Sequence, residues 1–228
     1  MEGRRWLPRL LLGVGAVALL AAIVSIAVGE GGPGANPVSG LNAVQPLYAG
    51  IPQDGSELGP EDAELTITVF TDLRCPACAR WQLAELDPLV EEYARTDRAA
   101  FELRHFSVGP EPTTLAALAA TAAGEQGRQW QYAGLLQRSL EAAAEYGEVD
   151  EEFLHDVAQS VPDLEFEQWE TDRASASVAS RVEADAELAA ELELPAGPAV
   201  VVTGPGGSRK LEESPPSDEI EAAIEAVG

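Results

Sequence analysis

The stretch "TVFTDLRCPACARW" (Thr68–Trp81) contains both cysteines of the 228-residue chain, Cys75 and Cys78, which stand three residues apart. The apolar, β-branched run Glu64–Asp72 precedes them and predicts a buried strand. The apolar spacing of Pro76–Arg95 predicts a helix. Proline is favoured at the first position of a helix, because the N–H that it lacks would have no partner there. The stretch therefore predicts a strand, a short loop and a helix that begins directly after the first cysteine.

This placement gives the two cysteines different chemistry. At a helix N-terminus, unpaired N–H groups and the helix dipole favour a negative charge, so Cys75 is expected to form a thiolate, the reactive state of cysteine. Cys78 lies one turn further along, where Cβ atoms three residues apart are about 5–6 Å from each other, and a bridge needs little adjustment. The helix hides Cys78 and leaves Cys75 exposed. The pattern predicts an attacking cysteine and a resolving one.

Other roles for the pair fit less well. A bridge across three positions removes little entropy from the unfolded chain, and a chain of this length can bury a core without it. Zinc takes about four ligands, and the two histidines, His105 and His155, stand apart with no further ligand near either; we expect both to be structural or surface residues. A hydrolase that uses a nucleophilic cysteine would lose it, because a second thiol one helical turn away would form a disulfide with it. The pair is therefore predicted to be redox-active, and no metal is expected.

The charge balance excludes one class of partner. The chain has 14 basic and 39 acidic residues and a net charge of −25. A nucleic-acid binder needs a basic face. We therefore expect no nucleic-acid partner and a solvated acidic surface.

The N-terminal region predicts a membrane segment. Residues 10–28, "LLLGVGAVALLAAIVSIAV", carry no charge and match about one bilayer span for a helix. The basic end, 1–9, precedes this span and acidic residues follow it, which predicts a cytoplasmic N-terminus and an extracytoplasmic domain. Cleavage as a signal peptide is the alternative, and in both cases the domain reaches a compartment where disulfides persist. Residues 29–47, which begin with a Gly/Pro-rich run, predict a flexible linker.

The remaining chain, 48–228, reads as one α/β domain. After the strand and helix around the cysteines, Ala100–Val108 alternates like a second strand. An alanine-, glutamate- and leucine-rich region at about 113–192 predicts several inserted helices. Pro198–Gly204 begins a hairpin, and Ser217–Val227 predicts a closing helix.

Gly50–Trp81 resembles the start of the DsbA-like thioredoxin-fold thiol–disulfide oxidoreductases, in their membrane-anchored or secreted bacterial form. The resemblance continues through Glu152–Glu170 and Ala184–Gly207 and covers the chain from about Tyr48 to its end. It implies a thioredoxin-like fold with a helical insertion, a Cys75–Cys78 bridge as the redox group, and no dissociable cofactor. The motif positions that carry the resemblance are Leu58, Gly59, Ala63, Phe70, Asp72, Cys75, Pro76 and Cys78.

The resemblance also implies a second element of the site, a cis-proline loop that faces the cysteines, and the matching residue is Pro198. The backbone of Gly197 would pair with an extended substrate, although the family usually has threonine or valine there. Val69 stands where some members have a buried acid for proton transfer. That task would fall to Asp72 or to water, and Asp72 has an equally good interpretation as a strand-end or capping residue.

The dipeptide Pro76–Ala77 between the cysteines bears on the direction of electron flow. A histidine between the cysteines could stabilise the Cys75 thiolate and raise the oxidising power, whereas Ala77 cannot, so we expect a milder oxidant than an enzyme with histidine at that position. The expected function is a membrane-tethered, extracytoplasmic oxidase that exchanges disulfides with exported cysteine-containing proteins and is reoxidised by a membrane redox partner. The alternatives are a reductase or isomerase, and a non-catalytic, chaperone-like binding module on the same fold.

Overall fold

The computed structural model describes residues 38–106, 114–142, 149–194 and 197–228. The chain divides into two compact units, 1–30 and 31–228, and every described residue belongs to the second. The predicted basic end and membrane span, 1–9 and 10–28, lie outside the described residues. Within the described ranges, none of the helices is both long enough and apolar enough to cross a membrane. The membrane span therefore stays a prediction.

The described residues form a six-stranded sheet with the strand order β1-β2-β4-β3-β5-β6. The central pair, β3 and β4, is parallel, and all other neighbours are antiparallel. The two strands predicted on either side of the cysteine helix are both present, as β3 and β4. The strands are β1 (Gln53–Asp54), β2 (Glu57–Leu58), β3 (Thr66–Thr71), β4 (Ala100–His105), β5 (Ala199–Gly204) and β6 (Gly207–Leu211).

The helix predicted after the cysteines is one continuous helical run in four parts. It comprises α2 (Pro76–Trp81), a π-helical turn (Gln82–Leu86), α3 (Asp87–Leu89) and a second π-helical turn (Val90–Ala94). Pro88 lies in the middle of this run and has no N–H to donate within the helix, which is a common cause of irregular turns.

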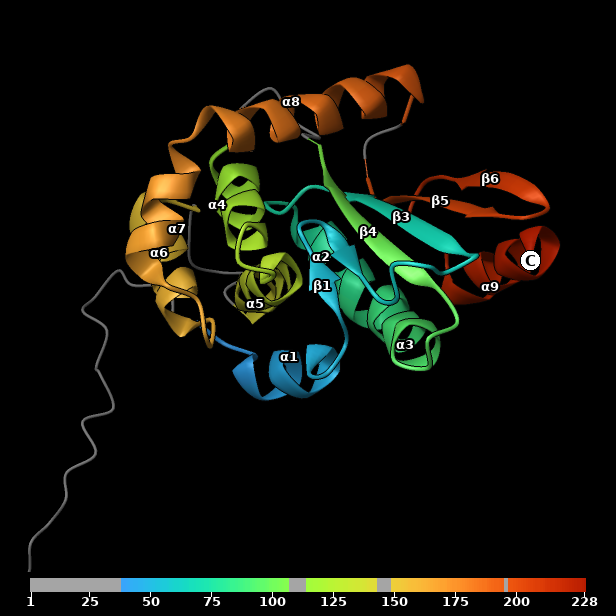
Figure 1. Ribbon diagram of the computed structural model, residues 1–228, viewed down its shortest axis with the longest axis horizontal. Coiled ribbons are helices and arrows are strands. Elements are labelled where there is room, and N and C mark those ends of the chain that lie inside the picture. Colours follow the sequence, from blue (N-terminus) through green and yellow to red (C-terminus); the bar gives the residue numbers. More distant parts are fainter. Residues whose placement is uncertain (1–37, 107–113, 143–148, 195–196) are drawn as a thin grey trace, which may run out of the picture. The chain divides into compact units, whose positions relative to one another are not determined.

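The run lies beside the closing helix α9 (Ser217–Val227), which packs on β5 (Figure 1). The indole nitrogen of Trp81 donates to the Pro215 carbonyl at 2.7 Å. The Glu85 carboxylate accepts from the backbone N–H of Ser217, at the N-terminus of α9, at 2.8 Å. These two bonds fix the start of the cysteine helix relative to the C-terminal part of the domain.

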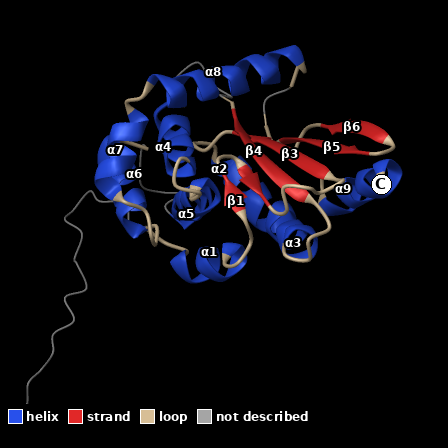
Figure 2. Ribbon diagram, in the orientation of Figure 1, coloured by secondary structure: helices blue, strands red, loops and turns tan. Residues whose placement is uncertain are grey.

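The predicted helical insertion is confirmed, and its described residues form five helices. These helices gather beside the sheet (Figure 2). The core of the insertion is aromatic: Trp130, Tyr132 and Trp169 are fully buried, and the last two rings stack with 5.8 Å between their centroids. The helices are α4 (Thr114–Gly124), α5 (Gln129–Ala142), α6 (Glu151–Ser160), α7 (Phe166–Arg173) and α8 (Ala176–Glu191).

The prediction of a flexible linker over 29–47 is wrong from Leu41 onward, because α1 (Leu41–Tyr48) is a helix that packs against α5. It buries Val44, Leu47 and Tyr48, which have the i, i+3, i+4 spacing of one helix face. The Arg95 guanidinium donates to carbonyls at the C-terminal end of α1, including that of Leu47 at 2.6 Å. Eight residues are too few for periodicity to outweigh the Gly/Pro-rich run before them.

Candidate active site

The two cysteines are joined in a disulfide at the start of α2, with 5.1 Å between their Cα atoms. Cys75 is the N-cap residue, and Pro76 occupies the first helical position, as the sequence predicted. The backbone N–H of Cys78 donates to the Cys75 sulfur at 3.1 Å. Cys75 is partly exposed, whereas Cys78 is fully buried. Only one sulfur of the bridge is therefore accessible to an attacking thiolate.

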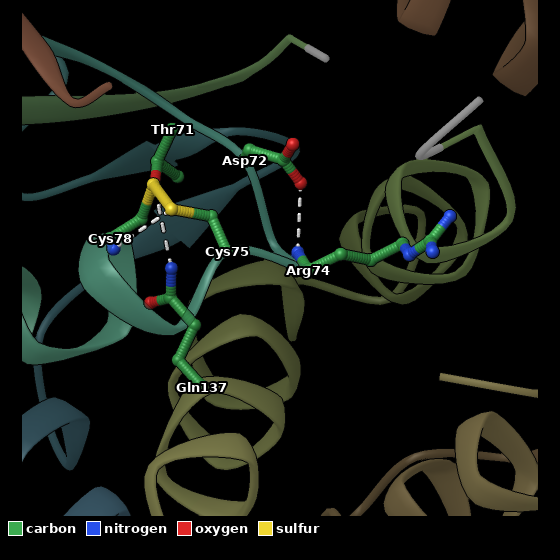
Figure 3. Close-up of a disulfide and its surroundings, with 6 residues drawn as sticks. All are labelled: Thr71, Asp72, Arg74, Cys75, Cys78 and Gln137. Carbon is green, nitrogen blue, oxygen red and sulfur yellow. Dashed lines mark hydrogen bonds between the residues drawn. A yellow bond between two sulfur atoms is a disulfide. The ribbon is translucent and has the colours of Figure 1, made fainter. Parts of the chain in front are cut away.

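The loop that presents Cys75 is shaped by Asp72. The Asp72 carboxylate accepts the backbone N–H of Arg74 at 2.8 Å, and the Asp72 carbonyl accepts that of Cys75 at 3.1 Å. Figure 3 shows this carboxylate turned toward Arg74 and away from the two sulfur atoms. Of the two interpretations of Asp72, this geometry supports the capping role at the end of β3.

A buried polar pair lies next to the bridge and was not anticipated from the sequence. Gln137, on α5, is fully buried, and its side-chain amide donates to the hydroxyl of Thr71, the last residue of β3, at 3.4 Å. Figure 3 shows the amide pointing from α5 toward the disulfide and this hydroxyl. A signal did exist in the sequence. Gln137 interrupts an apolar helix face whose other members are all buried, namely Ala133, Leu136 and Leu140.

His105, expected to be a structural or surface residue, is buried at the end of β4 directly beside Thr71. Its backbone N–H donates to the Asp185 carboxylate at 3.0 Å, and that carboxylate also accepts from Arg104 at 2.7 Å. The ring atom Nδ1 has no hydrogen-bond partner among the described residues. Burial lowers the pKa of His105 and outweighs the opposing attraction of the Asp185 and Asp72 charges. His105 is therefore a buried, uncharged residue near neutral pH.

The structure places Pro198 at the expected end of the sheet but corrects its geometry. The β3–β5 ladder ends with Phe70 opposite Ala199, so Pro198 stands where the cysteine loop leaves β3. Pro198 is buried, and its carbonyl accepts the Ser214 N–H at 2.9 Å. The expectation of a cis bond before it is wrong, since no cis peptide occurs in the described segments. The chain turns instead at Gly197, whose φ of 125° is a conformation that favours glycine.

Residues 53–226 match a family model described as thioredoxin. The chain belongs to the thioredoxin family. The probable disulfide bond formation protein D of Bacillus anthracis is 28% identical to this thioredoxin-family chain over 149 residues, 64% of the chain and 69% of that protein. The protein of the same name from Bacillus cereus is 26% identical over the same length.

Two solved structures share the fold of this thioredoxin-family protein. Oxidised BdbD from Bacillus subtilis has a TM-score of 0.61 and 21% identity, covering 77% of this chain and 95% of the other. Alpha-DsbA1 from Wolbachia pipientis has a TM-score of 0.63 and 16% identity, covering 79% and 94%. The predicted family is thereby confirmed, and the protein is a DsbA-like thiol–disulfide oxidoreductase.

Proposed function

We propose that this protein is an extracytoplasmic oxidase that transfers its Cys75–Cys78 disulfide to exported proteins containing cysteines. The observation that carries the proposal is the asymmetry of the closed bridge, whose first cysteine is partly exposed at a helix N-terminus while the second is fully buried. The name of the Bacillus anthracis relative, a probable disulfide bond formation protein, supports the same direction.

The reaction follows from this asymmetry. A substrate thiolate attacks the Cys75 sulfur and the bridge opens, so that the electron pair of the broken bond stays on Cys78. The second substrate thiolate then attacks the substrate sulfur of the mixed disulfide and releases Cys75 as a thiolate. Two electrons pass from the substrate dithiol to the enzyme, and the substrate thiols give up two protons. Reoxidation needs a two-electron acceptor, which we propose to be a membrane protein.

Groups around the disulfide would stabilise the Cys75 thiolate and position the substrate for this exchange. The N–H of Cys78 and the start of α2 face the Cys75 sulfur and would stabilise it as a leaving thiolate. Gly197 and Pro198 lie at the sheet end next to the cysteine loop, where we propose that they bind an extended substrate segment through backbone contacts. Residues 10–28 would hold the domain at the outer face of the membrane.

The decisive experiment traps the cysteines in living cells with acid and an alkylating reagent that adds mass to free thiols. An oxidase is expected to be found mainly with its bridge closed. A bridge found mainly open would replace the oxidase with a reductase or isomerase. A matched assay with the purified full-length chain and a reduced dithiol peptide tests catalysis itself, with Cys75→Ser as the inactive control. If Cys75→Ser oxidised the peptide as fast as the wild-type chain, the bridge would not be catalytic, and the alternative of a non-catalytic binding module would replace the oxidase.

The location is tested separately. The full-length chain is expected in the membrane fraction, with its folded domain accessible to protease added outside the cytoplasm. Replacing residues 1–28 by a cleavable export signal is expected to release the domain in soluble form. A full-length chain in the cytoplasmic fraction would contradict the proposed location.

A further inference from the structure

The Gly197–Pro198 turn lies beyond the last paired residues of the β3–β5 ladder, which ends at Ala199. Pro198 has no N–H to donate, but its carbonyl accepts the N–H of Ser214 at 2.9 Å. A Cβ atom placed on Gly197 would meet the Ser214 hydroxyl at 3.7 Å, so Ser214 lies beside both residues of the turn. The position of the turn therefore depends on what holds Ser214.

A stiff segment leads from this serine to the cysteine helix. The bridging segment, Ser214–Ser217, has the sequence S-P-P-S, and its two prolines have restricted φ angles. The carbonyl of Pro215 accepts the indole N–H of Trp81, a buried residue of α2, at 2.7 Å. The N–H of Ser217 donates to the Glu85 carboxylate at 2.8 Å. The bridging segment thus connects the turn before β5 with the helix that carries the disulfide.

The chain enters the bridging segment in an unfavourable backbone conformation. Glu213 and Ser214 have φ angles of 60° and 62°, in the left-handed region that residues with a side chain seldom occupy. Such conformations persist where the surrounding contacts determine them, and they gather at active sites and ligand-binding turns. Two in succession indicate that the position of Ser214 is maintained at a cost in stability.

We propose that Trp81 is a positioning residue that, through the bridging segment, fixes the Gly197–Pro198 turn relative to the cysteine helix. The indole N–H of Trp81 holds the carbonyl of Pro215, the residue directly after the serine that bonds to the turn. A turn that is already fixed loses less conformational freedom when it binds an extended substrate segment, so it binds that segment more strongly. The inference rests on the proposed binding of substrate at this turn, but not on the direction of electron flow.

The test compares two tryptophans that make the same kind of hydrogen bond in different places. Trp81→Phe keeps an aromatic ring and removes the indole N–H. Trp169→Phe is the matched control, because Trp169 is also buried and donates its indole N–H to a backbone carbonyl, that of Ala119 in the helical insertion, at 2.8 Å. The purified full-length chain in its oxidised form is mixed with a reduced dithiol peptide at several concentrations, quenched with acid and alkylated for mass spectrometry.

Trp81→Phe is expected to raise the half-saturating peptide concentration about tenfold, and Trp169→Phe less than about twofold, because only the first loosens the turn. The rate at which dithiothreitol opens the bridge should change less than about twofold in both variants, since so small a dithiol does not extend along the turn. A merely structural role of Trp81 would lower the free energy of unfolding in urea and leave the half-saturating concentration of the folded chain unchanged.

A folded Trp81→Phe with the wild-type half-saturating concentration overturns the proposal. An equal rise in Trp169→Phe, or an equal loss of rate with dithiothreitol, also overturns it. A wild-type chain that dithiothreitol reduces, but that does not oxidise the peptide, would overturn the proposed function itself and the inference with it.

Glu85 makes the test independent of whether Trp81→Phe folds. Glu85→Met keeps an unbranched side chain and removes the acceptor for the Ser217 N–H, so it is expected to raise the half-saturating concentration in the same direction. Glu85→Gln retains an acceptor oxygen and should stay within about twofold of the wild-type value. If Trp81→Phe does not fold, an unchanged half-saturating concentration in Glu85→Met overturns the proposal.

Discussion

The backbone N–H of Cys78 donates to the sulfur of Cys75 across 3.1 Å, so the second cysteine of the motif supplies a donor to the first. This bond exists while the bridge is closed, and the same N–H is in place for a thiolate when the bridge opens. Cys78 itself is fully buried beneath the first turn of α2. The hydrogen bond and the burial together give the two cysteines different roles. Cys75 forms the mixed disulfide with the substrate, and Cys78 resolves it.

This division predicts opposite behaviour for two serine variants. Cys78→Ser keeps the accessible thiol but lacks the resolving one, so it is expected to accumulate a mixed disulfide with an oxidised peptide. Cys75→Ser retains only the buried thiol and is expected to form no adduct. Non-reducing electrophoresis with mass spectrometry measures both. Equal adduct formation by the two variants would show that the buried sulfur is accessible, contrary to its burial in the closed form.

Ala77, the second of the two residues between the cysteines, should tune the redox equilibrium. Ala77 is exposed in the first turn of α2, next to the thiolate position of Cys75. Ala77→His is expected to raise the reduction potential by about 30 mV, a tenfold change, because an imidazolium there stabilises the thiolate. Arg80→His places the same side chain at another exposed position of α2 and should change the potential less. The idea fails if both histidines have the same effect.

Gly197 should be required for its backbone conformation. Its φ of 125° is unfavourable for other residues, whereas a methyl group added at this position would meet the Ser214 hydroxyl at 3.7 Å, an ordinary contact. Gly197→Ala is therefore expected to lower the free energy of unfolding by about 1–2 kcal/mol in denaturant titrations. Repeating the substitution in a Ser214→Ala background should give the same loss. A loss that vanishes in this background would identify crowding as the cause.

The pair formed by Asp87 and Arg138 should make stability depend on pH. The two side chains are hydrogen-bonded and largely buried. Burial raises the pKa of Asp87 from 3.8 to about 6, and the nearby Arg138 opposes this rise. Between about pH 4 and pH 6 the folded chain therefore holds a proton that the unfolded chain has released, so this carboxyl lowers the free energy of unfolding as pH rises.

Asp87→Asn isolates this contribution, since all other carboxyl groups are common to both proteins. The wild-type free energy of unfolding minus that of the variant is expected to fall by about 3 kcal/mol between pH 4 and pH 7, because one pKa unit corresponds to about 1.4 kcal/mol. Urea titrations at several pH values measure this difference. A difference that stays constant over the range, or rises, would contradict the raised pKa.

Local features of the sequence were sufficient for the parts of the fold that depend on neighbouring residues. The strand before Cys75, the helix after it, the inserted helices and the hairpin are all present, because periodicity and a proline at a helix start act within a few residues. The expectation for α1 failed for the opposite reason. Its eight residues are helical because Val44, Leu47 and Tyr48 pack against α5, which is remote in sequence.

The sequence alone determined that an attacking cysteine stands at a helix N-terminus with a second cysteine one turn behind it, since both facts depend only on the spacing around Pro76. Only the tertiary structure decided what surrounds the buried sulfur. Gln137 and Thr71 are 66 positions apart and meet because α5 packs against α2. Likewise, the turn before Pro198 is made by the φ of Gly197. Side-chain contacts of this kind follow from how whole elements pack, which no local pattern specifies.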